Sequence, residues 1–125
     1  MFMENLTAEE KQQSVEAFKS IIRKSEKALS HMKTDAPQTR LLQRRMKAAQ
    51  IGAETLLARW EGRETDICKT DLIEAKKELE SLLLTLPSFL KKSKEGSGQQ
   101  TYITRRIAAI KVAVFYMGYL IEKVE

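Results

Sequence analysis

Few residues of this chain have side chains that could act as nucleophiles, general bases or metal ligands. The 125 residues include one histidine, His31, and one cysteine, Cys68. Neither has the neighbours typical of a zinc site or a dithiol redox pair, and no Glu-x-x-His pair indicates a carboxylate-bridged metal centre. Glu74 and Glu78, with Lys77 between them, are typical of a solvated helix face with local ion pairs. We therefore expect no catalytic residue, metal, cofactor or small-molecule substrate.

The chemistry that the sequence does offer is the binding of anions by lysine and arginine. The chain has 22 basic and 17 acidic residues, a net charge of +5. Residues 24–47 and 88–111 together hold thirteen basic and three acidic residues, a net charge of +10, and the rest of the chain carries −5. Such a concentration attracts anions and accelerates association with an acidic surface or a phosphate backbone. Alternatively, these long side chains only keep helices soluble and cover apolar surface.

The elements that position these charges are predicted to be helices. Apolar residues recur at three- and four-residue steps, and caps and breakers separate the periodic segments. The sequence predicts four helices: from the capping box Thr7-Ala8-Glu9-Glu10 to about Met32, from about Gln38 to Glu61, from Asp71 to a kink or end at Pro87, and from Thr101 to about Val124. We expect Pro37 in the first turn of the second helix, a stop at Gly62, and a flexible linker over Lys91–Gln100.

The last predicted helix is more apolar than one buried face requires. Its inward stripe consists of Ile103, Ile107, Ile110, Val114, Met117, Ile121 and Val124. Four further residues, Val112, Phe115, Tyr116 and Tyr119, lie away from that stripe. Either the N-terminal Phe2, Met3 and Leu6 cover them, or they form an interface. We favour an interface with a second copy or a partner, because tyrosine combines apolar area with a polar tip.

These patterns predict an all-α fold, an antiparallel up-down four-helix bundle formed by a single domain over residues 1–125. In that topology the two basic stretches would lie at the same end of the bundle. The candidate anion- or partner-binding residues at this end are Arg40, Arg44, Arg45, Lys47, Lys91, Lys92, Lys94, Arg105 and Arg106.

The expected function is that of a non-enzymatic interaction module, with a protein partner, a homodimer or both. The alternative is a nucleic-acid-binding protein that uses the same basic end for phosphate contacts. Against the alternative, no helix-turn-helix signature is evident and aromatic residues are not interleaved with the basic cluster. We expect a cytoplasmic protein without a membrane partner, because the first residues lack a secretory signal pattern, one cysteine allows no internal disulfide, and no apolar run is long enough for a membrane span.

Overall fold

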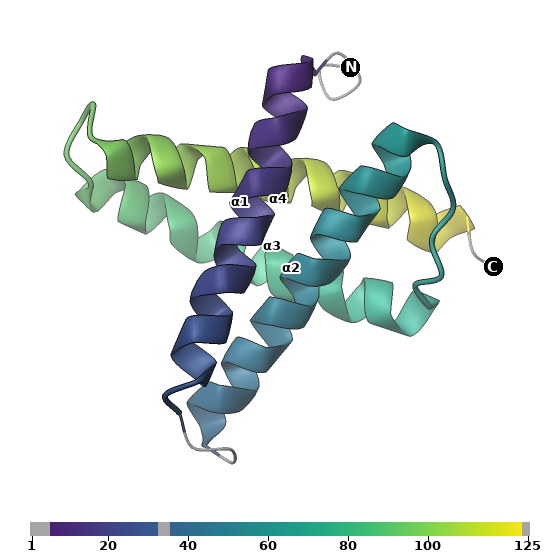
Figure 1. Ribbon diagram of the computed structural model, residues 1–125, viewed down its shortest axis with the longest axis horizontal. Coiled ribbons are helices and arrows are strands. Elements are labelled where there is room, and N and C mark those ends of the chain that lie inside the picture. The colour runs from purple at the N-terminus through teal and green to yellow at the C-terminus, as the bar shows by residue number, and fades with distance from the viewer. Residues whose placement is uncertain (1–5, 33–35, 124–125) are drawn as a thin grey trace.

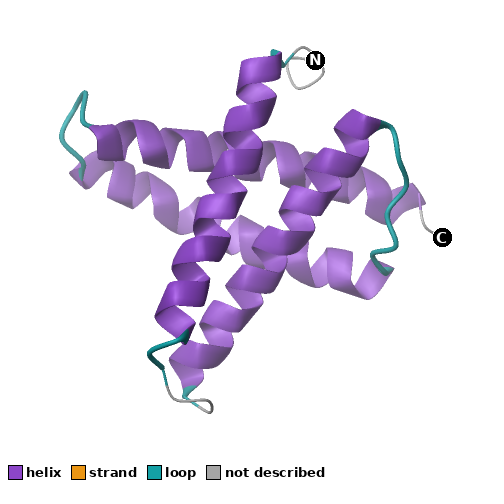
Figure 2. Ribbon diagram, in the orientation of Figure 1, coloured by secondary structure: helices purple, strands orange, loops and turns teal. Residues whose placement is uncertain are grey.

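The computed structural model describes residues 6–32 and 36–123, and within them it contains four α-helices and no strand (Figure 1, Figure 2). Helix α1 spans Ala8–Leu29, α2 spans Pro37–Glu61, α3 spans Lys69–Lys92 and α4 spans Gly98–Lys123. Within each of the pairs α1/α2 and α3/α4 the two helices run antiparallel and pack together, and α2 also packs against α3 (Figure 1). The predicted all-α four-helix bundle is confirmed.

Local sequence signals explain three boundaries of the first two helices. The Thr7 hydroxyl accepts a hydrogen bond from the Glu10 amide, and the Glu10 carboxylate accepts one from the Thr7 amide, so the capping box before α1 is formed. Pro37 opens α2, where a missing amide costs nothing. Gly62 ends α2 in the left-handed conformation, with φ of 70°.

Two helix boundaries differ from the prediction. Of the two predicted alternatives at Pro87, a kink or an end, the end does not occur. Helix α3 continues to Lys92, because Leu86 on one side of the proline is buried and Leu90 on the other packs against the core. This apolar packing compensates for the backbone hydrogen bond that proline removes. Helix α4 begins at Gly98, so the connection between α3 and α4 is limited to residues 93–97 and is shorter than the predicted linker.

The bundle consists of two helical hairpins that cross each other. In Figure 1 the α1/α2 hairpin lies in front of the α3/α4 hairpin, with the α1–α2 turn at the bottom and the α3–α4 turn at the left. The prediction that both basic stretches share one end is therefore wrong. Crossing lets α4 contact α1, α2 and α3. The crossing thus covers a helix that is apolar on most sides, which explains why crossed hairpins are favoured over hairpins aligned along one common axis.

The core lies where the hairpins cross and draws on all four helices. Its largest fully buried apolar side chains are Phe18, Leu56, Leu72, Leu79, Ile110 and Met117. Trp60 of α2 packs edge-on against Tyr116 of α4, with ring centroids 6.5 Å apart. The crossing therefore fixes which parts of the basic stretches come together and which remain exposed.

Candidate functional site

Three of the predicted cations form ion pairs between α2 and α3. The Nε atoms of Arg44 and Arg45 each lie 3.8 Å from a carboxylate oxygen of Glu78. The Nζ atom of Lys47 lies 3.2 Å from Asp71. These pairs are partly exposed, so each contributes little to stability, but they orient the two helices and reduce the positive charge available to a partner.

The other predicted cations, Arg40, Lys91, Lys92, Lys94, Arg105 and Arg106, form no ion pair with any residue that the structure describes. Four of them, Lys91, Lys92, Lys94 and Arg105, are exposed and belong to the α3/α4 hairpin near its turn. We call these four the cationic arm. Arg40 stands apart in the first turns of α2, near the other hairpin turn.

Exposed apolar side chains lie on α3 close to the cationic arm in sequence. The side chain of Leu84 is 84% exposed and that of Phe89 is 52% exposed. Neither residue is among the site residues predicted from the sequence. The sequence did contain a signal for Leu84, because this residue falls outside the helical spacing that turns Leu79 and Leu86 towards the core.

One small cavity brings the two basic stretches together. It has a volume of about 170 Å³ and receives side chains from all four helices. Three cations line it: Lys24 of α1, Arg45 of α2 and Arg106 of α4. The remaining lining residues are Ile21, Ser25, Leu42, Leu82, Leu86 and Ile110. We call this the four-helix cavity. No acidic residue lines it, although Glu78 lies near Arg45.

Tyr102 lies among the cations beside this cavity. The Nζ atom of Lys24 is 4.5 Å from the centre of its ring, and the guanidinium carbon of Arg106 is 4.9 Å away. The ring remains 38% exposed. The prediction that no aromatic residue is interleaved with the basic cluster is therefore wrong, and one argument against nucleic-acid binding is removed.

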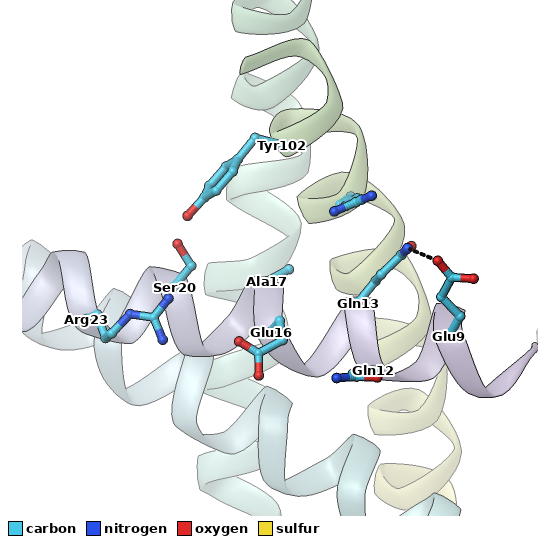
Figure 3. Close-up of a pocket in the computed structure, with 9 residues that line it drawn as sticks. Glu9, Gln12, Gln13, Glu16, Ala17, Ser20, Arg23 and Tyr102 are labelled. Carbon is cyan, nitrogen blue, oxygen red and sulfur yellow. Dashed lines mark hydrogen bonds between the residues drawn. The ribbon is translucent and has the colours of Figure 1, made fainter. Parts of the chain in front are cut away.

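Arg105 does not enter the four-helix cavity but lines a polar groove between α1 and α4, with a volume of about 460 Å³ (Figure 3). Its charges balance, since Glu9 and Glu16 oppose Arg23 and Arg105. The Gln13 amide donates a hydrogen bond of 3.3 Å to Glu9. No histidine or cysteine lines the groove. Arg44, by contrast, lines a groove between α2 and α3, so Arg44 and Arg105 do not form one site.

The predicted interface on α4 is only partly exposed. Val112 and Tyr116 are 3% and 5% exposed and belong to the core, because the first hairpin crosses over this part of α4. Leu6 packs against the core, as the alternative prediction had it, whereas Phe2 and Met3 lie outside the described residues. The exposed members of the predicted face are Phe115 and Tyr119.

Arg59 of α2 extends the exposed aromatic surface of α4. Its guanidinium carbon lies 5.2 Å from the ring centre of Tyr116 and 5.7 Å from that of Tyr119. Arginine stacked on tyrosine is frequent in protein interfaces, since both groups combine a flat apolar face with hydrogen-bonding edges. This contact holds Tyr119 in place while its ring stays 53% exposed.

Within residues 6–32 and 36–123, no three histidine, cysteine or acidic side chains are grouped as metal ligands would be. Over the same residues, no helix has both the length and the apolar character that crossing a bilayer requires. No protein-family model, curated protein or solved structure matches the chain. Its function is therefore inferred from its own side chains and their surroundings.

Proposed function

We propose that this protein is a non-enzymatic interaction module that docks an acidic surface of a protein partner through its cationic arm. The observation that carries the proposal is that Lys91, Lys92, Lys94 and Arg105 are exposed and paired with no described acid. Unpaired charges of one sign steer an oppositely charged partner and accelerate its association. We place the module in the cytoplasm, since its cysteine thiol at position 68 is free and exposed.

Exposed apolar residues near the cationic arm suggest what the partner surface resembles. Leu84 and Phe89 lie on the same helix as Lys91 and Lys92 and expose most or half of their side chains. Exposed apolar side chains on an element that also has exposed charges are typical of binding surfaces. The partner surface that fits combines a small apolar patch with surrounding aspartate or glutamate.

We further propose that Phe115 and Tyr119 of α4 associate with a second copy of the chain or with a protein partner. Both rings are partly exposed, at 39% and 53%, and Arg59 stacks on Tyr119. Aromatic and arginine side chains contribute most of the binding energy in many interfaces. This surface uses none of the residues of the cationic arm, so the two contacts can be tested separately.

The second candidate function is nucleic-acid binding, and Tyr102 is the observation that favours it. An exposed tyrosine beside Lys24 and Arg106 offers a ring for base stacking next to cations for phosphates. The first candidate is favoured because two cations already lie against the Tyr102 ring, which restricts its access to a base. Binding to nucleic acid would weaken steeply with added salt.

The discriminating experiment is affinity capture from the native host, with nuclease-treated and untreated samples scored for protein and for nucleic acid. We expect an acidic protein to be retained by the wild type after nuclease treatment. The combined variant Lys91→Glu, Lys92→Glu and Lys94→Glu should lose it, because the reversed charges repel an acidic surface.

The control carries Lys27→Glu and Lys77→Glu, which reverse two exposed lysines outside the cationic arm that pair with no acid among the described residues. It should retain the partner. Equal loss in this control would refute docking by the cationic arm. If nucleic acid is recovered, and nuclease treatment removes both this nucleic acid and all bound protein, the second candidate function replaces the first.

A further inference from the structure

Two arginines that line the four-helix cavity, Arg45 and Arg106, have guanidinium donors that no described acceptor satisfies. In the described part of the chain, Nε of Arg45 and both Nε and Nη2 of Arg106 are buried without a hydrogen-bond partner. Buried donors of charged groups are costly to leave unpaired, and proteins normally provide an acceptor for them. We propose that this cavity is a binding site for a phosphoryl group, whose oxygens supply the missing acceptors.

The two unpaired atoms of Arg106 form one edge of its guanidinium group. The N–H bonds of Nε and Nη2 on this edge are parallel, which is the arrangement that binds two oxygens of one phosphate or carboxylate. Arg45 offers a further donor, because its Nε lies 3.8 Å from Glu78, beyond hydrogen-bond length. The lining of the cavity therefore includes one arginine of α2 and one of α4 that each have an unpaired donor.

The charge of the lining selects a phosphoryl group over a carboxylate. Lys24, Arg45 and Arg106 place three cations around the cavity, and Glu78, which offsets part of the charge of Arg45, does not line it. A phosphoryl group carries up to two negative charges near neutral pH and has more acceptor oxygens than a carboxylate. It is therefore better matched to three cations. Ser25, which is 5% exposed, lines the same cavity and adds a hydroxyl donor.

The size and the apolar part of the lining also suit such a group. A volume of about 170 Å³ leaves room for one phosphoryl group. Aliphatic side chains, among them Leu42, Leu82 and Ile110, line the cavity beside the cations. Apolar walls lower the local dielectric response and strengthen the attraction between the cations and an anion.

This site goes beyond the proposed docking function and shares no residue with the cationic arm. Lys91, Lys92, Lys94 and Arg105 do not line the four-helix cavity. Loss of partner capture in the lysine variant would leave phosphate binding unchanged. Absence of phosphate binding would leave the docking proposal standing, so the two failures can be told apart.

The test titrates the full chain with inorganic phosphate at constant ionic strength and records heat by calorimetry. In parallel, the Nε–Hε signals of ¹⁵N-labelled arginine are followed by NMR. We expect saturable binding at one site and displacement of the Arg45 and Arg106 signals. Arg106→Gln should weaken binding about ten- to a hundredfold, because it removes charge-assisted hydrogen bonds. Lys24→Gln, at an exposed residue whose replacement spares the fold, should weaken it in the same direction.

Arg105→Gln is the matched control, since Arg105 is the sequence neighbour of Arg106 but lines a different groove. It should bind phosphate like the wild type. The proposal is overturned by the absence of saturable heat and NMR shifts, or by an equal loss in Arg105→Gln, which would indicate diffuse charge attraction. Acetate that binds as tightly as phosphate under the same conditions would overturn the assignment to a phosphoryl group.

Discussion

The aromatic ring of Phe18 in α1 lies directly against the backbone of α2 at Gly52. A methyl group added to Gly52 would stand 2.7 Å from Cε1 of Phe18, closer than van der Waals contact permits. Phe18 is fully buried in the core, so its ring has little space into which it can move. This contact sets how closely the two helices of the first hairpin approach each other.

Gly52→Ala is therefore expected to lower the free energy of unfolding by about 1–3 kcal/mol, the usual cost of overpacking a core. Gly118→Ala is the control, because the added methyl would meet only the flexible end of Lys76 at 3.6 Å. It should raise the free energy of unfolding by about 0.5–1 kcal/mol, since alanine favours a helix interior. Urea titration followed by circular dichroism measures both. Equal stability of the two variants would contradict the close contact.

Leu79 and Leu84 of α3 provide a second comparison, because one is fully buried and the other is 84% exposed. Leu79→Ala should cost about 2–5 kcal/mol of unfolding free energy, as expected for a cavity in a core. Leu84→Ala should change the same quantity by no more than about 0.5 kcal/mol. If Leu84 belongs to the docking surface, its alanine variant should also reduce partner capture. A large loss of stability in Leu84→Ala would show that its side chain is buried in solution.

Phe115 and Val112 test whether α4 mediates self-association. If it does, sedimentation equilibrium should give a multiple of 14.3 kDa for the wild type. Phe115→Asp should give the monomer mass of 14.3 kDa, with an unchanged midpoint of thermal unfolding. Val112→Asp should instead destabilise the fold by several kcal/mol, because it buries a charge in the core. A wild type of 14.3 kDa at high concentration would refute the homodimer.

Glu54 and Arg63 provide a prediction about pH. The guanidinium of Arg63 donates hydrogen bonds to Glu54 and lowers the pKa of that carboxyl below its usual value. A carboxyl with a lowered folded-state pKa stabilises the fold at pH values above its unfolded pKa of about 4.3, and the stabilisation disappears as the pH falls through the lowered value. Glu54→Gln should therefore unfold more easily than the wild type at pH 7.

The same comparison repeated at lower pH provides the internal control for Glu54. Denaturant titrations at pH 7 and pH 2.5 should show a small difference between Glu54→Gln and the wild type that shrinks towards zero in acid. The difference is small at any pH because the pair is substantially exposed to solvent. A difference that grows as the pH falls would contradict the lowered pKa.

The sequence determined the elements of this fold through local chemistry. The capping box at Thr7, the proline at position 37 and the glycine at position 62 act within a few residues of the chain, so their effects were predictable. The apolar spacing of the four segments predicted an all-α bundle with antiparallel neighbours. Pro87 predicted a kink or an end of the third helix, and α3 does not end there, because the burial of Leu86 and the packing of Leu90 continue the helix.

Only the tertiary structure decided which cations come together. Charge patterning along the chain identified the two basic stretches but carried no information about the angle between the hairpins. That angle places Lys24, Arg45 and Arg106 around one cavity and leaves Lys91, Lys92 and Lys94 on a separate arm. It also buries Val112 and Tyr116 while Phe115 and Tyr119 stay exposed. The crossing angle depends on how side chains from all four helices fill the core, a property of contacts between distant residues that helical periodicity does not encode.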